Sequence, residues 1–305
     1  MSEPLVSIVC IVFNHEPFLR QCLDGFVMQK TDFPVEILIH DDASTDGSAD
    51  IIREYEAKYP DLFRPIYQVE NQYSQGNDIW YGILFPRAKG KYIAICEGDD
   101  FWTDPLKLQK QIDFLENHPD FSMCFHSASI LRQGVGDLKT GAKFESIEER
   151  EYESTEIFTT WLVPTASIVF RKDTVLSHRT KHPEWLNRGD INLVLKCLAT
   201  GRVWGMSGVM SVYRMQPGSV LHNEQFRSKA VFDLPRHFKC LYINYPKVDS
   251  ASIKGCIAQA YYTRMKRQKH LLRRISDLLC VVYWSPKYAV TKVCGRHRTP
   301  LSPDN

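Results

Sequence analysis

The chain has 305 residues, of which 44% are hydrophobic, and this composition argues against disorder over most of its length. The length suits one large core with an appendage, or two modest domains. No apolar run approaches the roughly 18 residues of a membrane-spanning helix, and the start of the chain does not resemble a signal peptide. These features exclude an integral membrane protein and favour an enzyme-sized globular chain.

The cysteine pattern indicates the compartment. None of the nine cysteines forms a C-x-x-C pair. Several lie inside apolar periodic segments, as small buried thiols do: Cys10, Cys22, Cys96, Cys124 and Cys197. We therefore expect free thiols and a reducing cytoplasm.

The first 130 residues alternate between strand and helix patterns. Continuous apolar runs predict buried strands, and apolar residues spaced three or four apart predict helices. In chain order, the strands are expected at residues 5–13, 35–40, 65–69 and 92–96, and the helical patterns at 18–27, 51–55, 79–88 and 106–115. Such alternation predicts an α/β fold with a parallel sheet and helices on both faces.

The following residues belong to a different layer. Further strands are expected at 123–131, 161–171 and 209–213, a mobile excursion or lid at 133–155, and a helix at 191–200 opened by Gly189 and Asp190. After His222 the pattern is mostly helical. We divide the chain into residues 1–130, residues 131–222 and a C-terminal helical extension over residues 223–305.

The extension contains the strongly basic part of the chain. Residues 266–298 hold nine Lys or Arg and one acid, Asp277, whereas the remainder is net acidic. This segment suits a solvated helical face, a nucleic-acid patch or a contact with anionic lipid headgroups. The apolar insert 278–284 between basic flanks favours a membrane surface, and we expect no nucleic-acid partner. A terminal helix docked on the main domain fits the same residues equally well, so the expected location is cytoplasmic with a peripheral contact at the inner face of the membrane as one alternative.

The segment Glu97–Trp102 is the most informative about chemistry. It follows a predicted buried strand, and open α/β sheets bind ligands outside the carboxyl ends of their strands. Adjacent carboxylates at Asp99 and Asp100 suit a hard divalent cation that screens phosphate charge. A helix cap is the alternative, but Asp104 before Pro105 fills that role by itself.

Several motifs occur in one order: Val6–Asn14, then Glu36–Asp46, then Gly90–Ala94 leading into Gly98–Asp100. Over residues 4–220 the chain resembles the inverting family 2 glycosyltransferases, which have the GT-A fold. The resemblance implies that residues 1–130 form the nucleotide-sugar-binding half and residues 131–222 the acceptor-binding half.

The resemblance also implies the donor site. The loop from Ile11 to Asn14 corresponds to the wall against which the donor base packs, with Phe13 where the family often has tyrosine. Asp42 matches the carboxylate that accepts a hydrogen bond from uracil. Asp99 and Asp100 match the pair at the ribose and the metal, Mn²⁺ or Mg²⁺, with Asp100 more directly on the cation. For each acid a turn or cap is the alternative.

Two departures from the family pattern limit what transfers to the donor loop. The family commonly has proline or threonine at the position of Ile11, so a side-chain hydroxyl contact to the base is lost there. Glycine is frequent at the position of Ala43, and alanine is tolerable there only if the turn keeps a negative φ.

The acceptor half supplies the remaining candidates. Asp190 resembles the family's catalytic base, with Gly189 replacing the first acid of its motif, and an N-cap carboxylate is the alternative. Arg214, before Gln216, matches the segment that closes near the donor phosphates. Trp102 is either an apolar platform for the acceptor sugar or a core aromatic at a seam.

The resemblance therefore implies a metal-dependent hexosyl- or N-acetylhexosaminyl-type transferase that uses a nucleotide-diphosphate sugar, UDP-linked by family habit. The acceptor is expected to be a glycan or a lipid-linked glycan in bacterial surface polysaccharide synthesis. Two alternatives stay open at this point. A nucleotidyltransferase would share the sheet and the metal carboxylates, although residues 14–17 lack its glycine-rich phosphate loop. A noncatalytic nucleotide- or glycan-binding module is the other.

Overall fold

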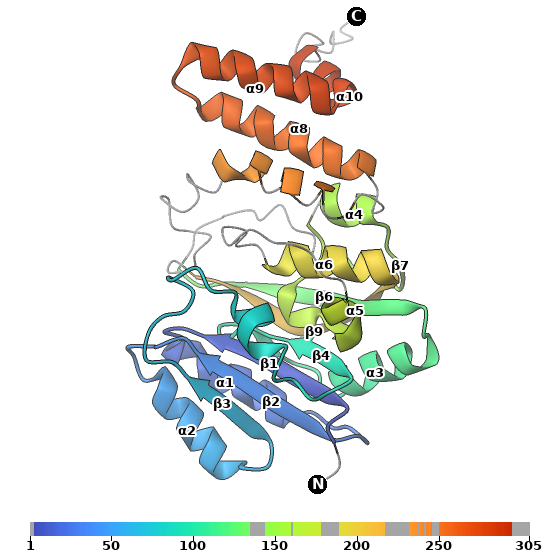
Figure 1. Ribbon diagram of the computed structural model, residues 1–305. Coiled ribbons are helices and arrows are strands. Elements are labelled where there is room, and N and C mark those ends of the chain that lie inside the picture. The colour runs from blue at the N-terminus through green and yellow to red at the C-terminus, as the bar shows by residue number, and fades with distance from the viewer. Residues whose placement is uncertain are drawn as a thin grey trace, which may run out of the picture. The chain divides into compact units, whose positions relative to one another are not determined.

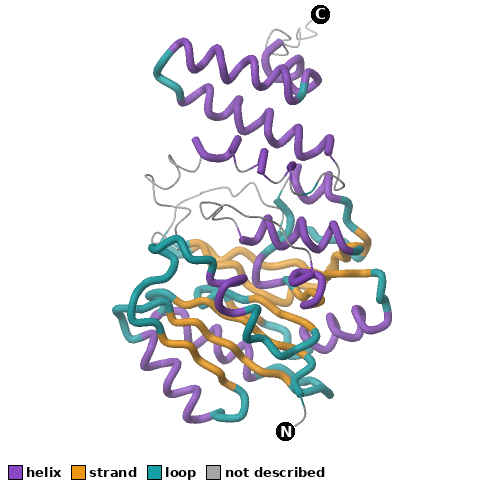
Figure 2. The backbone as a smooth tube through the Cα atoms, viewed as in Figure 1, coloured by secondary structure: helices purple, strands orange, loops and turns teal. Residues whose placement is uncertain are grey.

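The computed structural model describes residues 3–134, 144–159, 161–177, 189–216, 232–236, 238–240, 242–243, 245 and 250–294. The chain folds as two compact units, residues 1–217 and residues 218–305. The elements of the first unit are coloured from blue to yellow in Figure 1 and are separated into helices and strands in Figure 2.

The first unit begins with alternating strands and helices: β1 (Val6–Val12), α1 (Glu16–Val27), β2 (Val35–Asp41), α2 (Ser48–Lys58), β3 (Phe63–Tyr67), the π-helix η1 (Ile79–Leu84), β4 (Tyr92–Ile95), β5 (Phe101–Trp102) and α3 (Lys107–Asn117). It continues with β6 (Phe121–Arg132), β7 (Arg150–Glu151), α4 (Ser154–Thr159), the 3-10 helix η2 (Thr165–Ser167), β8 (Val169–Arg171), α5 (Lys172–Ser177), α6 (Gly189–Thr200) and β9 (Arg202–Met215).

One mixed sheet joins the described strands in the order β3-β2-β1-β4-β8-β6-β9-β5, and β7 pairs with β9. The strands β3, β2, β1 and β4 run parallel, so their carboxyl ends meet at one edge. β8 is antiparallel to both β4 and β6, whereas β6 and β9 are parallel. The predicted α/β architecture, with a mostly parallel central sheet and helices on both faces, is confirmed.

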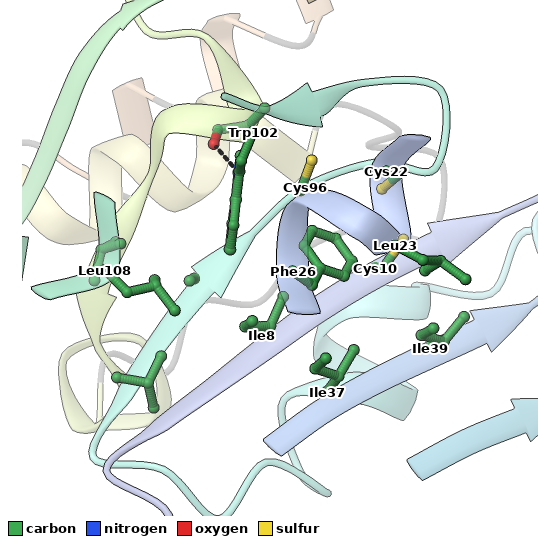
Figure 3. Close-up of a cluster of buried hydrophobic side chains, with 14 of the residues drawn as sticks. Ile8, Cys10, Cys22, Leu23, Phe26, Ile37, Ile39, Cys96, Trp102 and Leu108 are labelled. Atoms are coloured by element: carbon green, nitrogen blue, oxygen red, sulfur yellow. Dashed lines mark hydrogen bonds between the residues drawn. The ribbon is translucent and has the colours of Figure 1, made fainter. Parts of the chain in front are cut away.

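Alternate residues of the central strands enter two different cores. Ile8 and Cys10 of β1 pack in a cluster with apolar residues of α1, α2 and α3, which Figure 3 shows in part. Val9 packs in a second cluster with residues of η1 and α6. Because side chains of a strand alternate between the faces of a sheet, a strand covered on both sides is mostly apolar along its whole length. The continuous apolar run of the sequence therefore has its physical cause in these two layers.

Two local expectations differ from the structure. Residues 161–171 were expected as a strand, but only Val169–Arg171 form one, because Ser167 Oγ donates to the carbonyl of Pro164 (2.6 Å) and closes the turn of η2. The described part of the expected lid, residues 144–155, is packed. Phe144 and Ile147 are buried, and the amide of Ala128 in β6 donates to the carbonyl of Phe144. Residues 135–143 of that segment lie outside the described residues, as does His222.

The described part of the second unit is helical, as expected. Its long elements are α8 (Ser250–Arg267) and α9 (Leu271–Trp284), followed by α10 (Pro286–Ala289) and a π-helical turn η4 (Val290–Cys294). Arg264 of α8 holds Asp277 of α9 in a bidentate ion pair with distances of 2.6 and 3.2 Å. Within the described ranges, each helix lacks the combination of length and apolar character that a membrane crossing needs.

Candidate active site

The predicted site residues of the first half gather at the edge where the parallel strands end. The loop Ile11–Asn14 leaves β1, Asp42 follows β2, and the acidic loop Glu97–Asp100 follows β4. The amide of Gly98 donates to the carbonyl of Ile11 (3.0 Å), which holds the acidic loop beside β1. Glycine is required there, because a Cβ would lie 2.7 Å from Nδ1 of His15.

Arg214 of β9 fixes the acidic loop from the other side. Its backbone N–H donates to Asp100 Oδ1 (2.8 Å), and its Nε donates to the carbonyl of Asp99 (2.7 Å). The two terminal nitrogens donate to Gln133 and Gln21, and the residue is only 4% exposed. The phosphate contact predicted for Arg214 is not supported by this placement, because the guanidinium is buried and occupied by protein oxygens. Arg214 instead shapes the loop that carries the acids.

The acidic loop concentrates negative charge in a buried position. Burial and the charges of Asp99 and Asp190 raise the pKa of Glu97 to about 8. Burial and the charges of Asp99 and Glu97 raise the pKa of Asp100, and the hydrogen bond from Arg214 only partly offsets them. Oδ2 of Asp100 is buried and has no hydrogen-bond partner among the described residues.

The unpaired oxygen of Asp100 fits a divalent cation. No group of three or more His, Cys, Asp and Glu within the described part of the chain is arranged to hold an ion. Mg²⁺ and similar hard cations, however, are often bound by one or two carboxylates that act together with substrate phosphates. Asp99 is half-buried beside Asp100, and its Oδ2 accepts from Nε2 of Gln216 (3.2 Å). The donor set is therefore suited to a cation that arrives with a diphosphate.

Asp190 enters the same electrostatic neighbourhood from the start of α6. Its charge raises the pKa of Glu97, and burial together with the charges of Asp100, Glu97, Asp99 and Asp190 raises the pKa of Tyr213. Oδ1 of Asp190 accepts from the amide of Ile191 (2.8 Å), so the residue also caps its helix. A helix N-terminus favours the ionised carboxylate. The two roles predicted for Asp190 are thus compatible.

The neighbour of Asp190 explains a departure from the family pattern. A Cβ on Gly189 would lie 3.1 Å from the indole ring of Trp80, which is tighter than most side-chain contacts. Trp80 is itself buried in the second core. Trp80 therefore occupies the space that a side chain at position 189 would need, which accounts for glycine in place of the first acid of the family motif.

The loop after β1 has an exposed aromatic ring and a fixed backbone. Phe13 is 44% exposed. Asn14 has a φ of 56°, and its Oδ1 accepts from the amide of Thr45 (2.8 Å). Ala43 has a φ of 60°, so the expectation of a negative φ at this position is wrong. Alanine stores strain here of roughly 1 kcal/mol, because its Cβ crowds the backbone in the left-handed region.

Asp42 is buried and already engaged. Its Oδ1 accepts from the amide of Gln72 (2.7 Å) and faces Nε2 of His40 (3.2 Å), and its Oδ2 accepts from the amide of Tyr73 (3.1 Å). Nδ2 of Asn71 donates to its carbonyl. In this structure Asp42 therefore anchors the loop 71–73 beside the end of β2, and a contact with a base stays a prediction.

Trp102 lies in the core. It is 2% exposed, its indole N–H donates to the carbonyl of Ala166 (2.8 Å), and its ring meets Phe26 edge to face (Figure 3). Nζ of the buried Lys107 lies 4.0 Å from the ring centre. Of the two roles predicted for Trp102, this burial fits the core aromatic and leaves no open ring face for an acceptor sugar.

Two residues of the site were given no role from the sequence. Glu97 was seen as part of the acidic segment, and its position two residues before Asp99 was the available signal. Tyr213 begins the segment that resembles the one closing near the donor phosphates, and this resemblance was the available signal, although the side chain of Tyr213 was given no role. It lies on β9 next to Arg214, and its ring meets Phe144 edge to face.

Comparisons with known proteins identify the family and the fold of the chain. The family model "Glycosyl transferase family 2" matches residues 7–180, which is more than half of the chain. An uncharacterized protein of Mycobacterium tuberculosis is 36% identical over 72% of this chain, and the match spans 61% of that relative's length. TuaG of Bacillus subtilis, a glycosyltransferase assigned to teichuronic acid biosynthesis, is 26% identical over 79% of this chain and 90% of its own.

Solved structures share the fold at low sequence identity. TarS of S. aureus (residues 1–349), crystallised with UDP-GlcNAc, superposes with a TM-score of 0.66 at 17% identity, over 93% of this chain and 82% of its own. A mannosyltransferase of Pyrobaculum calidifontis in complex with GDP-Man and Mn²⁺ has a TM-score of 0.52 at 16% identity, over 98% of this chain and 89% of its own. From the family match and this shared architecture, the chain belongs to glycosyl transferase family 2 and has the GT-A fold.

Proposed function

We propose that this protein is an inverting glycosyltransferase that moves a hexosyl or N-acetylhexosaminyl group from a UDP-linked donor to a hydroxyl of a glycan or lipid-linked acceptor. Membership of the family supports sugar transfer. The structural likeness to a protein crystallised with UDP-GlcNAc supports the choice of nucleotide. The relation to TuaG supports bacterial surface polysaccharide synthesis as the setting.

The observation that carries the proposal is the meeting of two sets of acids. Glu97, Asp99 and Asp100 come from the end of β4, and Asp190 comes from α6, yet the charges of all four act on Tyr213. An acid on the acceptor side opposite acids on the donor side is what an inverting single displacement requires.

In the proposed reaction the acceptor hydroxyl oxygen forms a bond to C1 of the sugar as the bond from C1 to the diphosphate oxygen breaks. Asp190 takes the proton of the hydroxyl, and the nucleoside diphosphate leaves with the electron pair of the broken bond. The helix N-terminus at Asp190 favours the ionised carboxylate, which is the form that can accept that proton.

Asp99 and Asp100 would hold a divalent cation, Mn²⁺ or Mg²⁺, together with the donor diphosphate. Such a cation neutralises the negative charge that develops on the departing diphosphate. The unpaired Oδ2 of Asp100 supports this role. Arg214 serves it indirectly, because it fixes the backbone and one oxygen of the acid pair.

The donor base would lie against the loop after β1. The exposed ring of Phe13 offers a flat surface, and base stacking on an aromatic contributes roughly 1–3 kcal/mol in nucleic-acid systems. Ile11 would contribute backbone contacts, and Asn14 holds the loop to Thr45. Asp42 would reach the base through its own carboxylate or through the loop 71–73 that it anchors.

The test is a panel of nucleotide sugars, screened for binding and for metal-dependent turnover, followed by Asp190→Asn. We expect this variant to lose transfer by at least about a thousandfold while donor binding stays within about twofold, because only the proton acceptor is removed. The anomeric configuration of the product, measured by NMR, should be inverted.

The matched control is Asp113→Asn, the same chemical change on the exposed surface of α3. It should leave both binding and transfer unchanged. Equal loss of donor binding and transfer in Asp190→Asn would identify Asp190 as a structural acid and overturn its assignment as the base.

A further inference from the structure

Helix α9 exposes a series of large apolar side chains. Leu272 is 82% exposed and Tyr283 79%, values unusual for such residues outside an interface. The set, which we name the α9 stripe, consists of Leu271, Leu272, Ile275, Leu279, Val282 and Tyr283.

The α9 stripe occupies one side of the helix. Its members recur at intervals of three and four residues, and successive residues of an α-helix are rotated by about 100°. Asp277 and Val281, the buried residues of α9, project from roughly the opposite side. That opposite side is tied to α8 by the ion pair between Asp277 and Arg264. The apolar stripe is therefore not the face through which α9 packs on α8.

Over residues 250–294, which include α8 and α9, the exposed charges have one sign. Between residues 250 and 294 the sequence has a single acid, Asp277, and it is buried and neutralised by Arg264. The exposed cations near the start of α9 are Lys266, Arg267, Lys269, Arg273 and Arg274. Over residues 250–294 the exposed charged side chains near the stripe are therefore cations, and an apolar surface with such a border is complementary to a surface that is anionic outside and apolar beneath.

We propose that the α9 stripe docks this protein on an anionic lipid bilayer, with the helix lying in the plane of the interface. The apolar side chains would enter the boundary between headgroups and acyl chains while the cations meet lipid phosphates. The 14 residues of α9 are too few to span the bilayer, so the contact is peripheral. The inference goes beyond the sugar transfer and does not depend on it.

The test is sedimentation of the full chain with vesicles of phosphatidylcholine, with and without phosphatidylglycerol. We expect binding to the anionic vesicles only, weakened by added salt. The double variant Leu272→Gln/Leu279→Gln should bind at least about tenfold more weakly, since it removes apolar side chains from the interface. Arg273→Gln/Arg274→Gln should weaken binding by about tenfold or more and reduce its salt dependence.

The matched control is Val69→Gln, an apolar residue of the first unit that is 96% exposed. It should bind vesicles like the natural chain, and circular dichroism should show all variants folded. Equal binding to neutral and anionic vesicles, or unchanged binding of Leu272→Gln/Leu279→Gln, would overturn the proposal. A concentration-dependent dimer that this variant abolishes would assign the stripe to a second copy instead. No donor or acceptor is present, so failure here leaves the transferase assignment intact.

Discussion

Asp42 and Asp100 are equally buried acids that follow two strands on either side of β1, yet their surroundings are opposite. They are 1% and 2% exposed. The carboxylate of Asp42 accepts from two backbone amides and meets His40. That of Asp100 accepts from one amide, leaves Oδ2 unpaired and lies near two further acids.

The difference distinguishes a carboxylate that stabilises a loop from one that is suited to binding a ligand. A buried carboxylate with its oxygens satisfied stabilises the loop that satisfies it, whereas an unpaired buried oxygen among like charges costs free energy in the folded state. Proteins retain such an unfavourable arrangement at sites where a bound ligand relieves it. Asp42 therefore holds the loop 71–73, and Asp100 has the surroundings that the proposed cation would stabilise.

Replacing Asp100 should have the largest effect on function. Asp100→Asn removes a cation ligand, and we expect transfer to fall by at least about a hundredfold, with loss of the manganese-dependent part of UDP binding. Stability should not fall, because the amide oxygen still accepts from Arg214 while a buried charge disappears. Isothermal titration with UDP, with and without manganese, and urea unfolding measure the two effects.

Two results would contradict the role of Asp100. UDP affinity that is the same with and without manganese in the natural chain would remove the basis for a metal at this position. A loss of more than about 2 kcal/mol in the free energy of unfolding of Asp100→Asn would mark the residue as an anchor like Asp42. Asp113→Asn again serves as the control.

In contrast to Asp100→Asn, Asp42→Asn should lower the stability of the protein and should not affect the manganese dependence of UDP binding. One amide of the loop 71–73 would face an NH₂ group in place of an oxygen, so we expect the free energy of unfolding to fall by about 2–3 kcal/mol. Urea unfolding measures this loss. UDP binding should weaken with or without manganese, because the loop and not the cation is disturbed.

The matched comparison for Asp42→Asn is Asn71→Ala, which removes the separate hydrogen bond from Nδ2 of Asn71 to the carbonyl of Asp42. That neutral contact should contribute only about 1 kcal/mol. A stability loss below about 0.5 kcal/mol in Asp42→Asn would show that its carboxylate does not hold the loop.

The sequence predicts those parts of the fold that local pattern determines. β1 and β4 are covered on both faces, so their residues are almost all apolar and the ends of these strands can be recognised in the sequence. The acids of the loop after β4 are prominent for the same reason, since charge directly after a buried strand has few structural uses. Asp190 was predicted because Gly189 and Asp190, before an apolar helix, resemble the family's acidic motif.

The remaining features depend on partners that are distant in the chain. Whether Arg214 meets a phosphate or the acidic loop is decided by Gln21 and Gln133, which lie far from it in the sequence. Trp102 is buried because Ala166 offers a carbonyl to its indole. The positive φ of Ala43 cannot be read from the residue type, since alanine gives no sign of it. To predict any of these features, one must know which residues the folded sheet brings together.

The last expected effect is a pH dependence of stability that follows from the same crowding of acids. The pKa of Glu97 is about 8 in the folded protein, because burial and the charges of Asp99 and Asp190 raise it from the 4.5 of a free side chain. Between these two values the folded state binds more protons than the unfolded state, so the free energy of unfolding must fall as the pH rises. The contribution of one such group is at most about 1.4 kcal/mol per pH unit.

Urea unfolding without divalent metal should therefore show greater stability at pH 6 than at pH 8. The comparison is Glu97→Gln, in which this part of the dependence on pH is absent. Manganese with UDP should also flatten the dependence of stability on pH, because a bound cation favours the ionised acids. If neither Glu97→Gln nor the cation changed this slope, the acids of this loop would not interact with one another. The contrast between the surroundings of Asp100 and those of Asp42 would then lose its basis.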